Sequence, residues 1–150
     1  MLRFRGTFAH NIDAKGRLSI PNRFRDVLRE KNDDRLVITK GINHECLVTF
    51  PMDRWLETEE QVDNLPAGLA KDNFIRHFIS PAQDCAMDKM GRVLIPLQLR
   101  QEVGLNREVM VVGALGKFEI WDRAAWEAYY ENQATRDKAL ELLDDQNIRF

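Results

Sequence analysis

The alternation of apolar and polar residues along the chain predicts short strands, and the same order of elements occurs twice. A first strand, residues 7–12 and again 82–87, leads into an Asp-x-x-Gly segment typical of a tight turn. After the first turn, Leu18 and Ile20 alternate with polar residues, which is the pattern of a strand with one buried face. Two further apolar runs complete each half: residues 36–39 and 47–50, then 109–112 and 118–121.

Helical segments are predicted to follow the strands. Pro21 and Pro96 fit the first position of a helix, where a missing N–H is harmless, and Gly104 fits a helix stop. Asp53 and Asp122 are each placed to cap a further helix. The expected apolar helix faces are Phe24, Val27 and Leu28; Leu99 and Val103; Trp55, Leu56, Val62 and Leu65; Phe74, Ile75, Phe78 and Ile79; and Trp126, Tyr129 and Tyr130.

These elements belong to an internal repeat that spans the 150-residue chain. The segment Asp-x-x-Gly-Arg-x-x-Ile-Pro-x-x-x-Arg begins at Asp13 and returns at Asp88. Two copies are too few for a solenoid, so we expect a duplicated half-domain packed about a pseudo-two-fold axis. The predicted fold is β-rich α+β, with half-domains 1–80 and 81–150 and flanking helices. Residues 134–150 are charged and are expected to be frayed or to pair with a neighbour.

The repeated Asp and Gly predict how the turn is built. Gly16 and Gly91 stand where a turn between strands needs a positive φ, which glycine adopts without steric cost. Asp13 and Asp88 are placed to accept hydrogen bonds from nearby backbone N–H groups. We therefore assign these four residues a structural role in the turn.

Composition favours a soluble globular protein of a reducing compartment. Apolar residues make up 44% of the chain and charged residues 31%. No apolar run approaches the roughly 18 residues of a membrane span, and the N-terminal residues do not have the pattern of a secretion signal. Cys46 and Cys85 are isolated, which fits the cytoplasm and gives no disulfide framework.

The charge of the chain is distributed unevenly. The net charge is −2, yet residues 1–25 alone carry +5, so the remaining residues sum to −7. Such asymmetry is either the electrostatic footprint of a nucleic-acid binder or a cationic strand on an ordinary surface. The basic residues of this segment are Arg3, Arg5, Lys15, Arg17, Arg23 and Arg25.

The repeated segment Asp-x-x-Gly-Arg-hydrophobic-x-Ile-Pro resembles the swapped-hairpin, AbrB-like DNA-binding fold, here expected as tandem AbrB-like, double-psi-type half-domains. Two copies in a chain of this length, with Phe4-Arg5-Gly6 and the Gly-Lys-Phe-Glu-Ile-Trp-Asp of residues 116–122, resemble the MraZ family. The resemblance covers nearly the whole chain and is least informative beyond about residue 131.

Membership would imply a cytoplasmic, nucleoid-associated transcription regulator. The resemblance implies that it binds double-stranded DNA at short direct repeats upstream of the division and cell-wall gene cluster. It also implies assembly into a homo-oligomeric ring, of eight or more subunits.

A hairpin tip that exposes Lys15 and Arg17 has the chemistry to enter a major groove. A two-stranded ribbon fits that groove, Arg grips guanine bidentately, and Lys neutralises phosphate. Arg17 and Arg92 have two interpretations, a DNA contact or a local ion pair with the Asp of the turn, and the roles combine if the Asp orients the Arg. The predicted DNA-binding residues are Arg5, Lys15, Arg17, Arg23, Arg25, Arg92 and Arg100.

The second copy of the segment is less basic than the first. Lys15 is matched by Met90, and Arg23 by Gln98. Our hypothesis is that the N-terminal hairpin makes the main DNA contact and the C-terminal hairpin has a larger share in structure or assembly.

One hairpin offers few positive groups, so a monomer would bind DNA weakly at physiological salt. A multimer on repeated sites gains effective concentration by factors of roughly 10² to 10⁴. This favours an oligomer independently of the family. The aromatic residues Trp55, Trp121, Trp126, Tyr129 and Tyr130 are either subunit contacts or core.

Other chemistry is poorly supported. Asp13 and Asp88 lack the Asp-Thr/Ser-Gly order of aspartic proteases, and residues 113–117 lack the spacing of a phosphate loop. His44 and Cys46 have no second pair to complete a metal site. We predict no enzyme activity, metal, cofactor, membrane contact or small-molecule substrate. The alternative function is a protein-interaction or antitoxin-like module on the same fold.

Overall fold

The computed structural model describes residues 2–43 and 45–150. Met1 and His44 lie outside the described residues, and so does the His44 half of the His44 and Cys46 pair, which the sequence does not support as a metal site.

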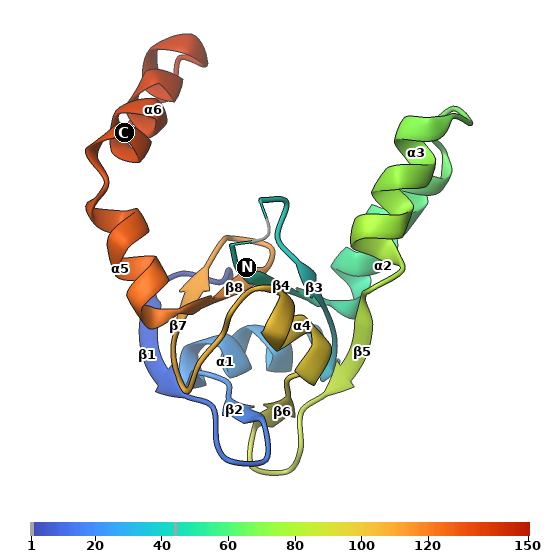
Figure 1. The fold of residues 1–150 in the computed structure, drawn as a ribbon, viewed down its shortest axis with the longest axis vertical. Coiled ribbons are helices and arrows are strands. Elements are labelled where there is room, and N and C mark those ends of the chain that lie inside the picture. Colours follow the sequence, from blue (N-terminus) through green and yellow to red (C-terminus); the bar gives the residue numbers. More distant parts are fainter. Residues whose placement is uncertain (1, 44) are drawn as a thin grey trace.

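Six strands form an antiparallel sheet in the order β1-β7-β8-β4-β3-β5, and a separate ribbon pairs β2 with β6 (Figure 1). The six strands of the sheet are β1 (Thr7–Asn11), β3 (Arg35–Lys40), β4 (Leu47–Pro51), β5 (Gln83–Ala86), β7 (Glu108–Gly113) and β8 (Phe118–Asp122). The ribbon consists of β2 (Arg17–Ser19) and β6 (Arg92–Leu94). This is the mixed, β-rich architecture that the sequence predicts.

The two repeats exchange their first strands. β1 pairs with β7 of the second repeat, and β5 pairs with β3 of the first. The two pairings have the same register. Phe8 and Gln83 are matched positions of the two repeats, and their partners, Val111 and Ile38, are also matched. β4 and β8 join the halves at the centre of the sheet, which completes the predicted pseudo-two-fold arrangement. Both repeats share this sheet, so the predicted boundary between half-domains at residue 80 stays a prediction that concerns the sequence repeat.

One hydrophobic core lies between the sheet and the ribbon. Leu18 and Val93, which pair across the ribbon, are 0% and 1% exposed. Phe24 packs its ring against Phe4 and Phe118, with centroid separations of 5.3 and 5.1 Å. Both repeats contribute to this core, so the buried face of the ribbon is fixed by packing from both halves.

Two helices close this core, α1 (Asn22–Lys31) and α4 (Leu97–Glu102). Pro21 and Pro96 precede them as N-cap residues with extended ψ of 140° and 129°, so the prediction that each proline is the first helical residue is wrong by one position. An extended ψ lets each strand run directly into its helix. Gly104, at a φ of 68°, lies just beyond α4, as predicted for a helix stop.

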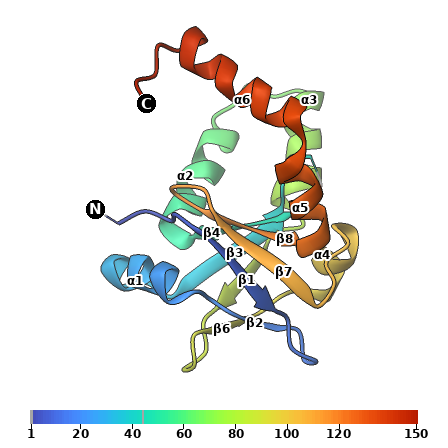
Figure 2. The same cartoon turned by 90° about the vertical axis from the view of Figure 1, so that its left-hand side faces the viewer.

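The remaining helices form two arms that rise from the side of the sheet opposite the ribbon (Figures 1 and 2). One arm contains α2 (Met52–Asp63), α3 (Leu69–Phe74) and the π-helical turn η1 (Ile75–Ile79); the other contains α5 (Arg123–Glu131) and α6 (Gln133–Asp145). Much of the charged segment 134–150 is thus helical. None of the helices among the described residues is long and apolar enough to cross a membrane.

The two predicted aspartate caps have different outcomes. Asp122 caps α5, since its carboxylate accepts a hydrogen bond from the backbone N–H of Ala125 at 3.2 Å. Asp53 does not cap α2, because the helix already begins at Met52; its carboxylate instead accepts a hydrogen bond from Lys31 at 2.9 Å.

The aromatic residues divide between core and surface. Trp55 and Trp121 are 5% and 6% exposed and belong to a second core beneath the arms. Trp126 is partly buried against that core, whereas Tyr129 and Tyr130 on the same helix are exposed. The core interpretation therefore holds for the two buried tryptophans, and the exposed tyrosines are left as candidates for contacts outside the chain.

Candidate nucleic-acid interface

The turns before β2 and β6 project beyond the sheet as two neighbouring tips (Figures 1 and 2). We name residues 13–17 the first tip and residues 88–92 the second tip. In the first tip, Asp13 N–H donates to the Arg17 carbonyl and Gly16 N–H donates to the Asp13 carbonyl, both at 2.9 Å. The second tip repeats these bonds at 2.8 and 3.0 Å. Gly16 and Gly91 have the expected positive φ, 83° and 75°.

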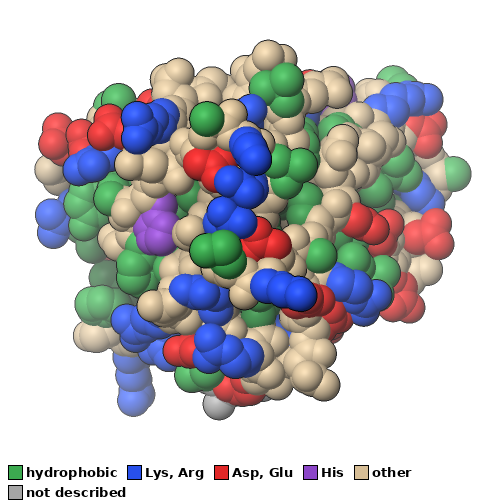
Figure 3. All heavy atoms as spheres, turned by 90° about the horizontal axis from the view of Figure 1, so that it is seen from below, with side chains coloured by type: hydrophobic (Ala, Val, Ile, Leu, Met, Phe, Trp, Pro, Cys, Tyr) green, Lys and Arg blue, Asp and Glu red, His purple; other side chains and the backbone are tan. Residues whose placement is uncertain are grey.

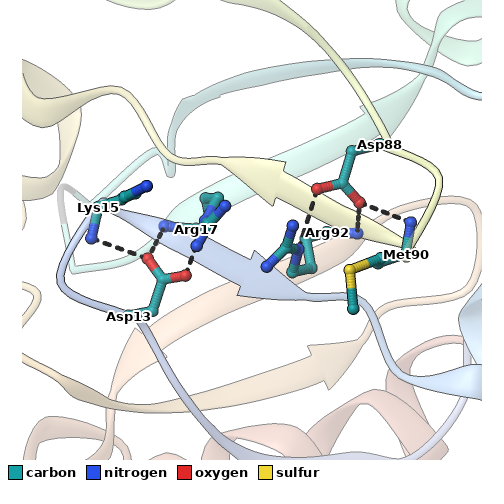
Figure 4. A network of polar contacts seen from close by, with 6 residues as sticks. All are labelled: Asp13, Lys15, Arg17, Asp88, Met90 and Arg92. Carbon is teal, nitrogen blue, oxygen red and sulfur yellow. Dashed lines mark hydrogen bonds and ion pairs between the residues drawn. The ribbon is translucent and has the colours of Figure 1, made fainter.

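Each tip aspartate binds both the turn and the arginine (Figure 4). Asp13 Oδ1 accepts hydrogen bonds from the backbone N–H groups of Lys15 and Arg17 at 2.9 Å, and Oδ2 accepts from Arg17 Nε at 2.8 Å. Asp88 makes the same three contacts with Met90 and Arg92, all at 2.9 Å. The bond from the arginine backbone is the largest cause that lowers the pKa of each carboxyl group, so both remain ionised at neutral pH.

Arg17 and Arg92 keep the outer edge of the guanidinium open. Each uses Nε for its ion pair, and neither places a terminal nitrogen in a hydrogen bond with any described residue. Their side chains are 32% and 24% exposed. The two interpretations of these arginines are thus compatible, because the carboxylate orients the group and leaves its terminal N–H donors available.

The tips interlock across the repeats. Ile20 N–H donates to the Gly91 carbonyl and Ile95 N–H donates to the Gly16 carbonyl, both at 2.9 Å. Arg25 of α1 covers Gly91 so closely that a Cβ there would lie 2.5 Å from its Nη1. Arg100 of α4 covers Gly16 more loosely, because a Cβ on Gly16 would lie 3.5 Å from Arg100 Cζ. Each helix therefore supports the tip of the other repeat.

This exchange redistributes the basic residues that lie close together in the sequence. Lys15 and Arg17 belong to the first tip, but Arg25 lies at the second tip with Lys89 and Arg92. Arg100 of the second repeat lies at the first tip. Figure 3, seen from the side of the tips, shows Lys and Arg side chains gathered over the middle of this face. The charge of residues 1–25 thus gives no reason to favour one tip, and the hypothesis that the N-terminal hairpin dominates loses this support.

The structure separates Arg5 from the other predicted site residues. Its neighbour Phe4 forms a bridge with Leu115, and the backbone at Arg5 lies against Gly113, at the end of β1 away from the first tip. Arg23 is exposed in the first turn of α1, two residues before Arg25. The tips, Arg25 and Arg100 therefore form one basic face, to which Arg5 does not belong, and Arg23 lies on the helix beside it.

Sequence reasoning missed three exposed apolar side chains of the second repeat. Met90 is 67% exposed at the second tip, Leu94 is 61% exposed on β6, and Leu97 is 58% exposed at the start of α4. The alignment of the repeats contains the signal, because the alternation that turns Ser19 outward does the same to Leu94.

Within residues 2–43 and 45–150, no group of three or more His, Cys, Asp and Glu side chains lies close enough to hold a metal ion. The two free thiols are poorly suited to reaction. Burial raises the pKa of Cys85 to about 11 and raises the pKa of Cys46 further.

Comparison with known proteins supports the same reading of the chain. The family described as "MraZ protein, putative antitoxin-like" matches residues 3–73 and again residues 78–146. A protein of Moorella thermoacetica is 43% identical over 138 residues, covering 91% of this chain and 93% of its own length. One of Shewanella woodyi is 42% identical over 151 residues, covering 98% and 96%. Both relatives are named "Transcriptional regulator MraZ". The chain therefore belongs to the MraZ family of transcriptional regulators.

Proposed function

We propose that this protein regulates transcription by placing the β2–β6 ribbon in the major groove of double-stranded DNA. The observation that carries the proposal is the pair of arginines, Arg17 and Arg92, each oriented by a carboxylate with its terminal N–H donors open. A two-stranded ribbon fits a major groove, and an arginine held in one orientation discriminates guanine bidentately.

The surrounding cations supply the part of the affinity that does not depend on base sequence. Lys15 at the first tip and Arg23 on α1 are exposed and are proposed to bind phosphates. Arg25 and Arg100 brace the opposite tips and add positive charge beside the groove. Arg5 is proposed to contact DNA only beyond the segment that the tips occupy, because it lies at the other end of β1.

We further propose that the protein acts on the nucleoid in the cytoplasm, as a homo-oligomeric ring of eight or more subunits on short direct repeats. The target implied by family resemblance is the promoter of the division and cell-wall gene cluster. A single basic face of a few cations binds weakly at physiological salt, and several faces on repeated sites bind with avidity. Both arms expose apolar side chains that suit subunit contacts: Leu56, Leu65, Leu69, Tyr130, Leu140 and Leu142. The protein is proposed to work without catalysis, cofactor or small-molecule substrate.

A salt titration on defined duplexes tests the proposal. Duplexes with one, two and four copies of a short repeat, obtained by selection from a random pool, are compared with a scrambled duplex. We expect affinity to fall steeply with salt, to rise with copy number, and to favour the repeats. Light scattering of the free protein and of the complex reports the number of subunits.

Affinity that is indifferent to both salt and base sequence would overturn the regulator proposal. That result, together with capture of a defined protein partner, would favour the protein-interaction or antitoxin-like module. The subunit number is a separate outcome, since a small oligomer that still binds repeats contradicts only the ring.

A further inference from the structure

The basic face has an apolar strip that belongs almost entirely to the second repeat. Met90, Leu94 and Leu97 are exposed there, and their counterparts in the first repeat are Lys15, Ser19 and Asn22. The two halves of the face thus have the same backbone and opposite polarity at three matched positions.

Leu94 lies at the centre of this strip. It pairs directly with Arg17 across the ribbon, so both side chains project from the same face. Its Cδ1 lies 3.5 Å from the position of a Cβ on Gly16, which places the side chain against the first tip. Packing within the protomer does not account for Leu94, because it is 61% exposed while its neighbour Val93 is 1% exposed.

The surroundings of Leu94 select the kind of partner. Arg17 is its cross-strand partner, Arg92 lies two residues away on the same side of β6, and Arg100 lies over the same glycine. A second copy of this chain docked on the same face would bring like charges together. Double-stranded DNA instead supplies compensating phosphates at the edges of the groove.

The floor of a major groove holds one apolar group, the C5-methyl of thymine, beside the hydrogen-bonding edges of the bases. We propose that Leu94, with Met90 beyond it, contacts thymine methyl groups, so that the second repeat reads apolar edges while the first repeat reads polar ones. This inference rests on the proposed function and assigns a specificity role within it.

The difference between the halves gives the bound protomer a direction. A pseudo-two-fold ribbon with identical faces would read a palindrome equally well in both orientations. Ser19 and Leu94 occupy equivalent positions and make different contacts, a hydrogen bond for Ser19 and an apolar contact for Leu94, so one orientation is preferred. Copies that bind in one orientation match repeats in tandem rather than inverted repeats.

Replacing thymine by uracil tests the inference, because the change removes only the methyl group. The probe is a duplex selected from a random pool by the unmodified protein, with each thymine replaced singly. We expect one or two replacements to weaken binding about fourfold each, the value for one buried methyl group. Leu94→Ser, which installs the residue of the first repeat, should weaken binding to the thymine duplex and lose the response to uracil at the same position.

Matched controls separate the outcomes. Leu115→Ser removes an equally exposed leucine from the β7–β8 turn and should retain the response to uracil. If every uracil duplex binds as well as the parent while Arg17→Ala still weakens binding, the methyl contact is wrong and the proposed function stands. If Leu94→Ser changes the subunit number by light scattering and not the response to uracil, this face contacts another subunit and the inference fails. If no duplex is bound in a salt-dependent way, the proposed function and the inference fail together.

Discussion

The first tip and the second tip have nearly the same backbone and differ in the side chains that face outward. Both use Asp, Gly and Arg for the same hydrogen bonds, and both are covered by an arginine of the opposite repeat. Between these fixed residues, Ala14 and Lys15 of the first tip correspond to Lys89 and Met90 of the second. Residues that build the turn are held by geometry, and the exposed positions between them are free to take different roles in binding.

The largest effect on binding is expected from the arginines that the tips share. Arg17→Ala and Arg92→Ala should each weaken binding to a selected duplex by about 1–3 kcal/mol, because each removes a proposed bidentate base contact. Fluorescence anisotropy at fixed salt measures the loss, with Arg136→Ala on α6 as a control of equal charge. If Arg92→Ala binds normally while Arg17→Ala does not, the N-terminal hairpin dominates after all.

A smaller effect, on stability, is expected to differ between the glycines. Gly16→Ala should destabilise the protein by about 1–2 kcal/mol, because alanine is strained at a φ of 83°. Gly91→Ala should cost more, since its Cβ would lie 2.5 Å from Arg25 Nη1 and 2.7 Å from Arg25 Cδ, in addition to the same strain. Urea unfolding of both variants measures the difference. Equal losses would show that Arg25 moves aside freely.

The tip aspartates are expected to affect stability in acid and to do so equally. Their pKa values are lowered in the folded protein, so their contribution is present above the ordinary aspartate pKa of about 3.9 and is lost as pH falls through the folded pKa. Asp13→Asn and Asp88→Asn should each flatten the fall of Tm with decreasing pH below about 4. Asp33 is the internal control, because its hydrogen bond with Arg35 lowers its pKa to about 2. The fall of Tm that comes from Asp33 should therefore remain in both variants. An unchanged Tm profile in either variant would contradict the equivalence of the tips.

The smallest effect is expected from the lysines. Lys15→Ala and Lys89→Ala should each reduce the slope of log K against log salt by about 0.9, the contribution of one phosphate, without changing base preference. Equal reductions would show that both tips lie against the DNA backbone. If only Lys15→Ala reduced the slope, Lys89 and Met90 of the second tip would point away from the phosphates.

The sequence predicted the repeat and the turns because Asp13, Gly16 and their counterparts form local contacts. It did not predict the redistribution of charge. The alternating pattern of β1 fits equally well beside β3 or beside β7, and only tertiary packing selects β7 as its partner. Nearness in the sequence groups Arg5 with the tips, although an extended strand carries it away from them. Asp53 was expected to cap α2, but the helix begins one residue earlier directly from β4. The outward position of Leu94 is evident only when the two copies are aligned, because polar Ser19 holds the matched position in the first copy.

The exchange of first strands also constrains how the chain is made. Phe8 pairs with Val111, so β1 leaves the ribosome roughly 5–20 s before its partner at ordinary elongation rates. During that time β1 and the first tip have no native sheet to join, and such distant pairing slows folding. A chain cut short before β7 therefore cannot complete the face that carries both arginines. Under the proposed function, a chain released before β7 therefore lacks a complete DNA-binding face.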